Sequence, residues 1–205
     1  MMEKFLEIEN LRARFRARSI SMPFMKRFAL LLLLCVPIEM GFGAPEKAID
    51  REVIVKAPVD KVWQAWTTTE GIKTFFAPDG HVELRVDGPF EIFFNPYAPA
   101  GEKGADGMRI IGFQENRMLS FTWNAPPHLP EARKQRSVVI VRFESAGEGQ
   151  TRVSLHHVGW GEGGEWDKAF AYFSTAWPHV LQNLQESFSK GPVNWTNWLE
   201  QLKKK

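Results

Sequence analysis

The 205-residue sequence predicts an α+β fold in which a curved antiparallel sheet of about seven strands wraps around one long C-terminal helix. Short strand-like segments separated by turn residues fill the middle of the chain. Two short helical segments lie between the first and second strands, and one long helical stripe follows the last strand. Because a single apolar helix must cover a long sheet, we expect the sheet to curve around it.

The folded part begins with a strand and two short helices. Residues 51–56 alternate between apolar and polar side chains, which predicts the first strand. Pro58 suits the first turn of a helix, and the apolar residues of 59–66 recur at spacings of three and four. A second short helix is predicted over 70–76, because the residue before Pro78 disfavours helical backbone angles.

Six further strands and their turns follow the second helix. Asp87-Gly88-Pro89 is typical of a hairpin turn. Three glycines and two prolines predict a long loop over 95–107, and a proline-rich turn is predicted over 125–130. The strands are predicted over 82–86, 90–94, 108–113, 118–123, 137–144 and 151–158.

The last large element is a long amphipathic helix. Aromatic residues and leucines keep a helical period over 166–188. Pro178, in the middle of this stretch, removes one backbone hydrogen bond and is expected to kink the helix. A final short helix is predicted over 194–202, with Trp195 and Trp198 on one stripe that closes a cavity mouth or touches a membrane surface.

Four passages resemble the helix-grip superfamily called SRPBCC or START-like, and within it the group named for the activator of heat-shock protein 90 ATPase and its bacterial single-domain homologues. They are KAPVDKVWQAWT at 56–67, TFFAP at 74–78, LSFTW at 119–123 and TRVSLHHVGW at 151–160. The resemblance implies a helix-grip domain over 44–190 with an apolar cavity between the sheet and the long helix. Residues 191–205 then form an additional Trp-rich tail.

Strand parity indicates which residues face such a cavity. Side chains two apart on a strand share a face, so the apolar sets of the predicted strands point inward, opposite the aromatic stripe of the long helix. The alternative is a solid core, because a stripe of this kind is more often packing. The ligand-binding candidates are Phe90, Ile92, Phe94, Phe121, Trp123, Val141, Phe143, Leu155, His157, Trp166, Phe170, Phe173 and Trp177.

His157 is the titratable residue among these candidates. Desolvation by apolar neighbours is expected to keep its ring neutral. The ring then serves either as a hydrogen-bond partner or base for a ligand, or as a core histidine with satisfied hydrogen bonds. Its neighbour His156 is expected to face solvent, so the pair cannot chelate one metal. The GxGxxG match over 159–164 lacks a following parallel strand, and no HExxH or serine-triad pattern is present. We therefore predict no catalytic residue, metal site or cofactor.

The N-terminal segment has the pattern of a secretory signal. Basic residues at 25–27 precede an apolar run at 28–36 and then small residues. We predict an N-terminal extension and signal peptide over 1–43, cleaved after Gly43, with Met25 as an alternative start. The apolar run is too short for the roughly 20 residues of a spanning helix, so no stable membrane insertion is expected.

Cleavage changes the charge and the thiol content of the chain. Residues 1–43 carry seven of the 26 basic and four of the 24 acidic residues, so the net charge changes from +2 to −1. A near-neutral domain lacks the excess of basic residues that is typical of nucleic-acid-binding proteins. The only cysteine, Cys35, leaves with the signal segment. The expected location is periplasmic or secreted, with a cytoplasmic location as the alternative.

Three functions fit these expectations. The first is an exported, non-enzymatic binding protein for a small hydrophobic or lipid-like ligand. The second, which the superfamily resemblance implies, is a cyclase or dehydratase that uses His157 or Arg109 on a polyketide-like or aromatic substrate. The third is a module that regulates a chaperone ATPase, which requires a cytosolic location. The sequence does not specify an oligomeric state.

Overall fold

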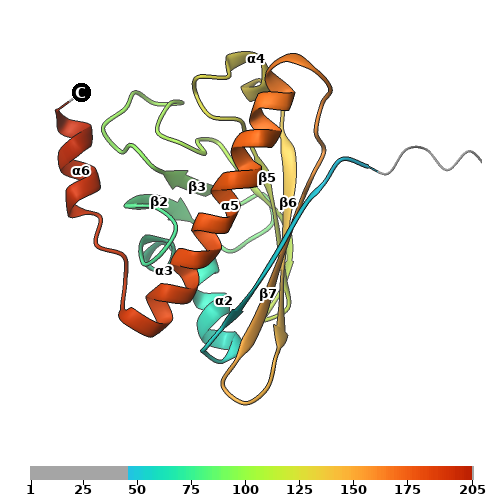
Figure 1. Cartoon of the computed structure of the whole chain (residues 1–205), viewed down its shortest axis with the longest axis vertical. Coiled ribbons are helices and arrows are strands. Elements are labelled where there is room, and N and C mark those ends of the chain that lie inside the picture. The colour runs from blue at the N-terminus through green and yellow to red at the C-terminus, as the bar shows by residue number, and fades with distance from the viewer. Residues whose placement is uncertain (1–45, 205) are drawn as a thin grey trace, which may run out of the picture. The chain divides into compact units, whose positions relative to one another are not determined.

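A long helix, α5 (Gly164–Lys190), crosses one face of an antiparallel sheet in this computed structural model, as Figure 1 shows. The structure describes residues 46–204, which belong to one compact unit. The predicted signal peptide, its cleavage at Gly43 and Cys35 lie outside the described residues. Within residues 46–204, every helix is too short or too polar to cross a membrane.

The elements follow the predicted order, with one short helix in addition. That helix is α4, in the proline-rich segment where the sequence predicts only a turn. In chain order with α5, the elements are β1 (Ile49–Val55), α2 (Val59–Thr67), α3 (Thr69–Lys73), β2 (Asp79–Val82), β3 (Phe90–Phe93), β4 (Ile110–Gln114), β5 (Met118–Trp123), α4 (Pro130–Arg133), β6 (Ser137–Ser145), β7 (Thr151–Val158) and α6 (Thr196–Lys203).

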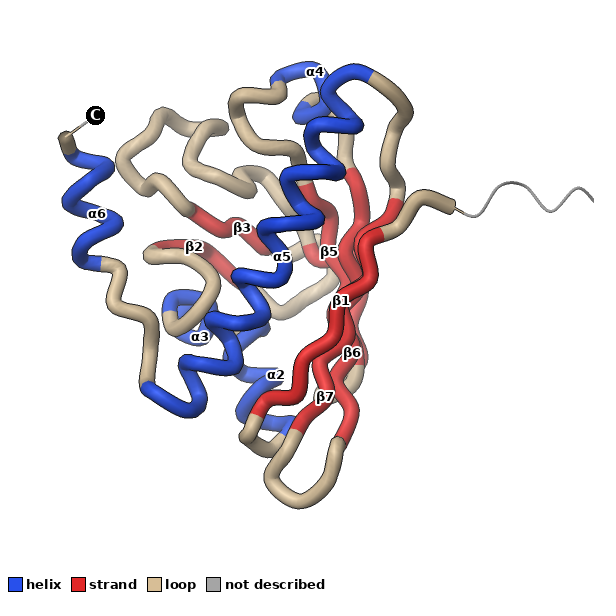
Figure 2. Tube along the Cα trace, in the orientation of Figure 1, coloured by secondary structure: helices blue, strands red, loops and turns tan. Residues whose placement is uncertain are grey.

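The seven strands form two sheets, whereas the sequence predicts one. Five strands pair in the order β1-β7-β6-β5-β4, and β2 pairs with β3 in a separate hairpin; Figure 2 shows the neighbouring strands β1, β7 and β6 side by side. The backbone N–H groups of Asp87 and Phe90 still donate hydrogen bonds to the carbonyls of Ile110, the first residue of β4, and Met108, which precedes it. Between these contacts Pro89 forms an isolated bridge with Arg109, so the pairing of the hairpin with the residues before β4 is limited to this point.

The second strand is shifted from its predicted position. It covers Asp79–Val82, and residues 83–86 belong to the connection to β3. Arg85 donates its backbone N–H to Glu83 O, and Gly88 donates to Arg85 O, which fixes a tight turn. Asp87 has a φ of 59°, a left-handed conformation that Asp tolerates better than most residues. Turn chemistry therefore ends the strand before Leu84.

The predicted inner face of the sheet is confirmed. Val139, Val141 and Phe143 on β6 are buried, as are Val153 and Leu155 on β7. The two strands pair with these residues in register, so their side chains form one continuous apolar surface. This surface and the apolar face of α5 define where the core lies.

Helix α5 is continuous through Pro178. A proline at this position leaves the carbonyl of Ser174 without its usual helical donor. Arg51 of β1 supplies the missing donor, because its Nη2 lies 3.0 Å from Ser174 O. This hydrogen bond, at the point where Pro178 interrupts the helical pattern, connects β1 to α5.

Helix α4 depends on a contact from α5. The Glu165 carboxylate accepts hydrogen bonds from the backbone N–H groups of Glu131 (2.7 Å) and Ala132 (3.0 Å). A carboxylate at this position satisfies donors that the first turn of a helix otherwise leaves unpaired. Ala132 and Leu129 then pack in a small second core with Ala169 of α5. This long-range partner is why the proline-rich sequence forms a helix.

Candidate ligand-binding cavity

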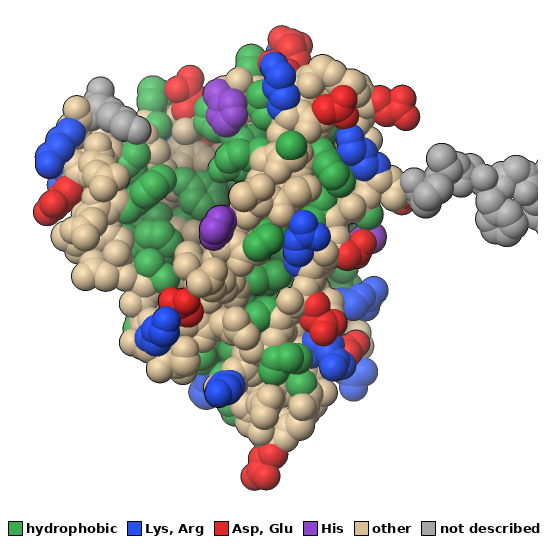
Figure 3. Space-filling model, in the orientation of Figure 1, with side chains coloured by type: hydrophobic (Ala, Val, Ile, Leu, Met, Phe, Trp, Pro, Cys, Tyr) green, Lys and Arg blue, Asp and Glu red, His purple; other side chains and the backbone are tan. Residues whose placement is uncertain are grey.

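A cavity of about 460 Å³ opens beside α5, where the end of β3 and the loops 94–105 and 124–128 meet the helix. Figure 3 shows the hollow as a patch of hydrophobic side chains next to the long helix. Its largest apolar lining side chains are Phe76, Phe94, Trp123, Phe173, Trp177 and Val180. Its polar lining side chains are Asn95, Glu102, Asn124, His128 and Tyr172.

Four of the predicted ligand-binding residues line this cavity, namely Phe94, Trp123, Phe173 and Trp177. They come from the end of β3, from β5 and from the N-terminal half of α5. Their common position is a geometric finding, and their role in binding a ligand stays a prediction.

The remaining candidates do not line the cavity. Most fill the space between the sheet and the helices, where Phe90 and Phe121 stack with ring centroids 4.0 Å apart and Trp63 meets Phe143 edge-on at 5.4 Å. Over most of its length the sheet–helix interface is therefore a solid core. The candidates outside the cavity lining are Phe90, Ile92, Phe121, Val141, Phe143, Leu155, His157, Trp166 and Phe170.

Trp166 and Phe170 belong to a different contact. They pack against Trp160, with centroid distances of 6.3 Å and 5.2 Å. Trp166 also reaches the second core beside α4. The helical stripe predicted for these residues is correct, but the first turns of α5 face α4 and the β7–α5 loop.

The inner wall of the cavity is a layer of packed rings. Trp123 lies 5.4 Å from Trp177 and stacks on Phe76 at 5.8 Å. Phe173 stacks on Trp177 at 6.0 Å. Rings at these separations fix one another's orientation. The wall is therefore a preformed aromatic surface.

His157 lies directly behind this wall and is 0% exposed. Trp177 Nε1 donates a hydrogen bond to His157 Nδ1 (2.9 Å), and Ser137 Oγ lies 2.7 Å from His157 Nε2. Because Nδ1 accepts, these partners assign the proton of the neutral ring to Nε2, which donates to Ser137. Burial, with a smaller effect from His156, lowers the pKa of His157 to about 3.

The pairing of Ser137 with His157 does not make a nucleophile and base. A base must accept the proton of the serine hydroxyl, but Nε2 carries the ring proton while Trp177 donates to Nδ1. Neither Ser137 nor His157 lines the cavity. Arg109 is exposed and also lies outside the cavity lining. The geometry gives neither His157 nor Arg109 access to a molecule in the cavity.

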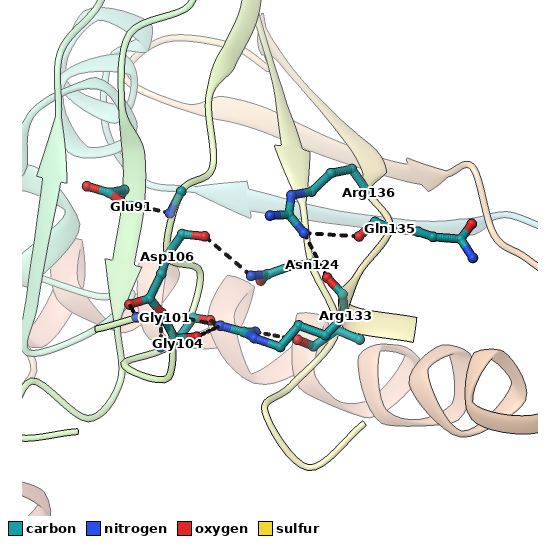
Figure 4. Close-up of polar contacts among 10 residues, drawn as sticks. Glu91, Gly101, Gly104, Asp106, Asn124, Arg133, Gln135 and Arg136 are labelled. Carbon is teal, nitrogen blue, oxygen red and sulfur yellow. Dashed lines mark hydrogen bonds and ion pairs between the residues drawn. The ribbon is translucent and has the colours of Figure 1, made fainter. Parts of the chain in front are cut away.

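Arg133 of α4 joins two walls of the cavity, as Figure 4 shows. Its guanidinium donates to the carbonyl of Ala125 on one wall and to the carbonyls of Gly101 (2.6 Å) and Gly104 (2.8 Å) on the other. The Asp106 carboxylate lies 3.3 Å from the same group and also accepts from two backbone N–H groups of its own loop. Burial lowers the pKa of Arg133, and the charge of Asp106 acts against this effect.

Helix α6 braces the wall that carries Phe94. Trp198 Nε1 donates to Phe94 O (2.8 Å), and Trp195 Nε1 donates to the carbonyl of Lys73 (2.6 Å), the last residue of α3. No described residue of α6 lines the cavity. The indole N–H groups of this tail are engaged by the backbone of Phe94 and Lys73, and closure of the cavity mouth by the tail stays a prediction.

Sequence reasoning missed the polar lining residues. Asn95, Glu102, His128 and Tyr172 stand on loops or on the side of α5 next to the predicted stripe, where no periodicity marks them. Partial burial raises the pKa of Tyr172. Among residues 46–204, no three His, Cys, Asp or Glu side chains come together as a set of metal ligands.

The five-stranded sheet, the long C-terminal helix and the aromatic cavity beside it define a helix-grip protein. Residues 56–189 match the family described as "Activator of Hsp90 ATPase homolog 1-like protein", and the chain belongs to this family within the SRPBCC superfamily. The predicted family resemblance is confirmed. A comparison of the sequence with curated proteins finds no match.

Solved structures share the fold at low sequence identity. Protein MLL2253 from Mesorhizobium loti is 19% identical over 72% of this chain and all of its own, with a TM-score of 0.55. The Aha1 dimer from Colwellia psychrerythraea is 22% identical, covering 71% and 98% of the two chains with a TM-score of 0.54. CalU16 from Micromonospora echinospora is 21% identical, covering 78% and 83% with a TM-score of 0.52. At this identity the likeness concerns the fold alone.

Proposed function

We propose that this protein binds a small hydrophobic molecule in the cavity beside α5. The observation that carries the proposal is the aromatic wall formed by Trp123, Trp177 and Phe173, which borders about 460 Å³ of space. Cavities of this size with mostly apolar linings and a few polar groups are typical of small-molecule sites. Removing the ligand's apolar surface from water supplies the binding energy.

An enzymatic function has less support. His157 and Arg109 do not line the cavity, and His157 has both ring nitrogens engaged. Among the described residues, no hydrogen bond joins the titratable lining groups Glu102, His128 and Tyr172 into a relay. A general acid or base requires such positioning for efficient proton transfer. We therefore propose carriage or storage of the ligand rather than turnover.

Export remains part of the proposal and rests on the sequence alone. The basic residues at 25–27 and the apolar run at 28–36 favour secretion with Ala44 as the mature N-terminus. Determining the N-terminus of the protein from its own host tests this point. An intact N-terminal segment on a cytosolic protein would instead favour the chaperone-regulating function.

Calorimetric titration with 2-naphthylmethanol tests binding. Its 12 non-hydrogen atoms, at roughly 0.5 kcal/mol each, correspond to a Kd in the range of tens of micromolar. Ala176 lines the cavity, so Ala176→Trp should fill the space and abolish binding. Ala171→Trp is the matched control, because Ala171 is exposed on the same helix and does not line the cavity. Equal binding by the two variants would contradict the proposed site.

A further inference from the structure

The charge that lines the cavity is negative. Among residues 46–204, Glu102 is the charged carboxylate of the lining, and no Lys or Arg side chain belongs to it. The other titratable lining side chains are those of His128 and Tyr172. A negatively charged ligand would therefore lose its hydration at the aromatic wall without gaining a cationic partner there.

Two positive charges close to the lining must be weighed against this. Lys103 follows Glu102 in the chain, but its Nζ lies 5.2 Å from the centroid of the Phe93 ring, and neither Lys103 nor Phe93 lines the cavity. The other positive charge is that of Arg133. Its side chain is 14% exposed and lies behind the walls, where backbone carbonyls of both walls and the Asp106 carboxylate accept its hydrogen bonds. Asp106 is equally shielded and offsets its charge, with a smaller contribution from Glu102. Arg133 does not line the cavity, so its donors are not available to a ligand.

The aromatic lining also favours positive charge. The faces of Trp, Tyr and Phe rings carry negative potential and attract ammonium groups within about 6 Å of the ring centroid. Trp123, Trp177 and Phe173 form the inner wall, and Tyr172 contacts Phe173 edge-on at 5.1 Å. Glu102, an exposed lining residue of the 94–105 loop, adds a carboxylate that can pair with a cation in the cavity.

We propose that the cavity selects ligands with a ring-sized apolar body and a cationic amine head, and discriminates against carboxylates. This inference rests on the proposed ligand-binding function and adds the chemical class of the ligand. The apolar body lies against the tryptophan wall, and the ammonium group lies toward Glu102 and the half-exposed ring of Tyr172, which also lines the cavity. Cation–π attraction and the exposed carboxylate together correspond to a preference of about threefold to tenfold over a neutral head.

Three ligands that share the 2-naphthyl body test the selectivity by calorimetry at pH 7 and low ionic strength, where an exposed carboxylate is least screened. They are 2-naphthylmethylamine, 2-naphthylmethanol and 2-naphthoate. We expect the amine to bind about threefold to tenfold more tightly than the alcohol, and the carboxylate to bind most weakly. Glu102→Gln should reduce the ratio of the alcohol Kd to the amine Kd. Glu148→Gln removes the same charge from the β6–β7 turn and should leave this ratio unchanged.

Each outcome separates this inference from the proposed function. Binding of the alcohol with equal or tighter binding of 2-naphthoate overturns the charge selectivity and leaves ligand binding intact. An amine preference that is the same in Glu102→Gln and Glu148→Gln overturns the role of Glu102. Absence of binding by all three ligands overturns the proposed function and the selectivity together.

Discussion

Acidification from pH 7.5 to pH 5 should destabilise the fold through one buried side chain, His157. In the folded state the ring is neutral, since Trp177 donates to its Nδ1 and Nε2 contacts Ser137. Burial lowers the pKa from 6.5 to about 3, whereas the unfolded chain regains an ordinary histidine pKa. The unfolded state therefore binds the proton first as the pH falls.

The sign and size of the effect follow from these pKa values. The contribution of His157 is complete above pH 6.5 and is lost progressively as the pH falls towards 3. Each pH unit within this window corresponds to about 1.4 kcal/mol for one proton. At pH 5 the free energy of unfolding should be about 2 kcal/mol lower than at pH 7.5 on account of this residue.

Urea unfolding followed by tryptophan fluorescence measures this difference. His157→Gln removes the titrating group. Between pH 7.5 and pH 5, the free energy of unfolding of this variant should therefore fall by about 2 kcal/mol less than that of the wild type. His156→Gln is the matched control, because the His156 side chain is 44% exposed and pairs with Asp50 on the outer face. Equal pH dependence in the wild type and His157→Gln would refute the reasoning. NMR titration of the His157 ring gives a second readout and should show no protonation down to pH 5.

Three further perturbations test the packing around the cavity. Arg133→Lys should cost about 2–3 kcal/mol of unfolding free energy and expose the 101–106 loop to proteolysis, because one ammonium cannot replace a guanidinium that bridges two walls; Arg136→Lys, at an exposed site, should change neither measurement. Leu184→Ala should cost about 2–5 kcal/mol in urea unfolding, since Leu184 is fully buried on α5; a loss below 1 kcal/mol would contradict the core packing. Trp198→Phe removes the donor to Phe94 O and should cost about 0.5–1.5 kcal/mol while speeding amide exchange near residue 95; unchanged exchange would show that α6 does not brace the wall.

The elements and the inner face of the sheet could be predicted because they depend on local periodicity. Val139, Val141 and Phe143 alternate along β6 as period two requires, and all three are buried. Helix α4 could not be predicted from its own residues, because its first turn depends on Glu165 from a distant segment. The separation of the β2–β3 hairpin from the main sheet could not be predicted either, because it depends on how few backbone hydrogen bonds residues 87–90 make with β4 and the residues before it in the folded chain.

Only some of the residues that line the cavity could be predicted from the sequence. Periodicity identified Trp123 and Trp177 as inward-facing, but it could not distinguish a ring that borders a space from one that fills it. That distinction depends on where the 94–105 loop lies, and Arg133 fixes the loop through carbonyls rather than through any sequence pattern. Glu102 and His128 became visible as lining residues only once the loops were placed.

Native mass spectrometry of the protein recovered from its own host is the decisive test of ligand binding in the cavity. We expect a non-covalently bound small molecule on the wild type and on Ala171→Trp, and its absence from Ala176→Trp, in which the cavity is filled. A bound molecule that persists in Ala176→Trp, or a wild type that carries none and takes up no naphthyl ligand, would contradict this expectation.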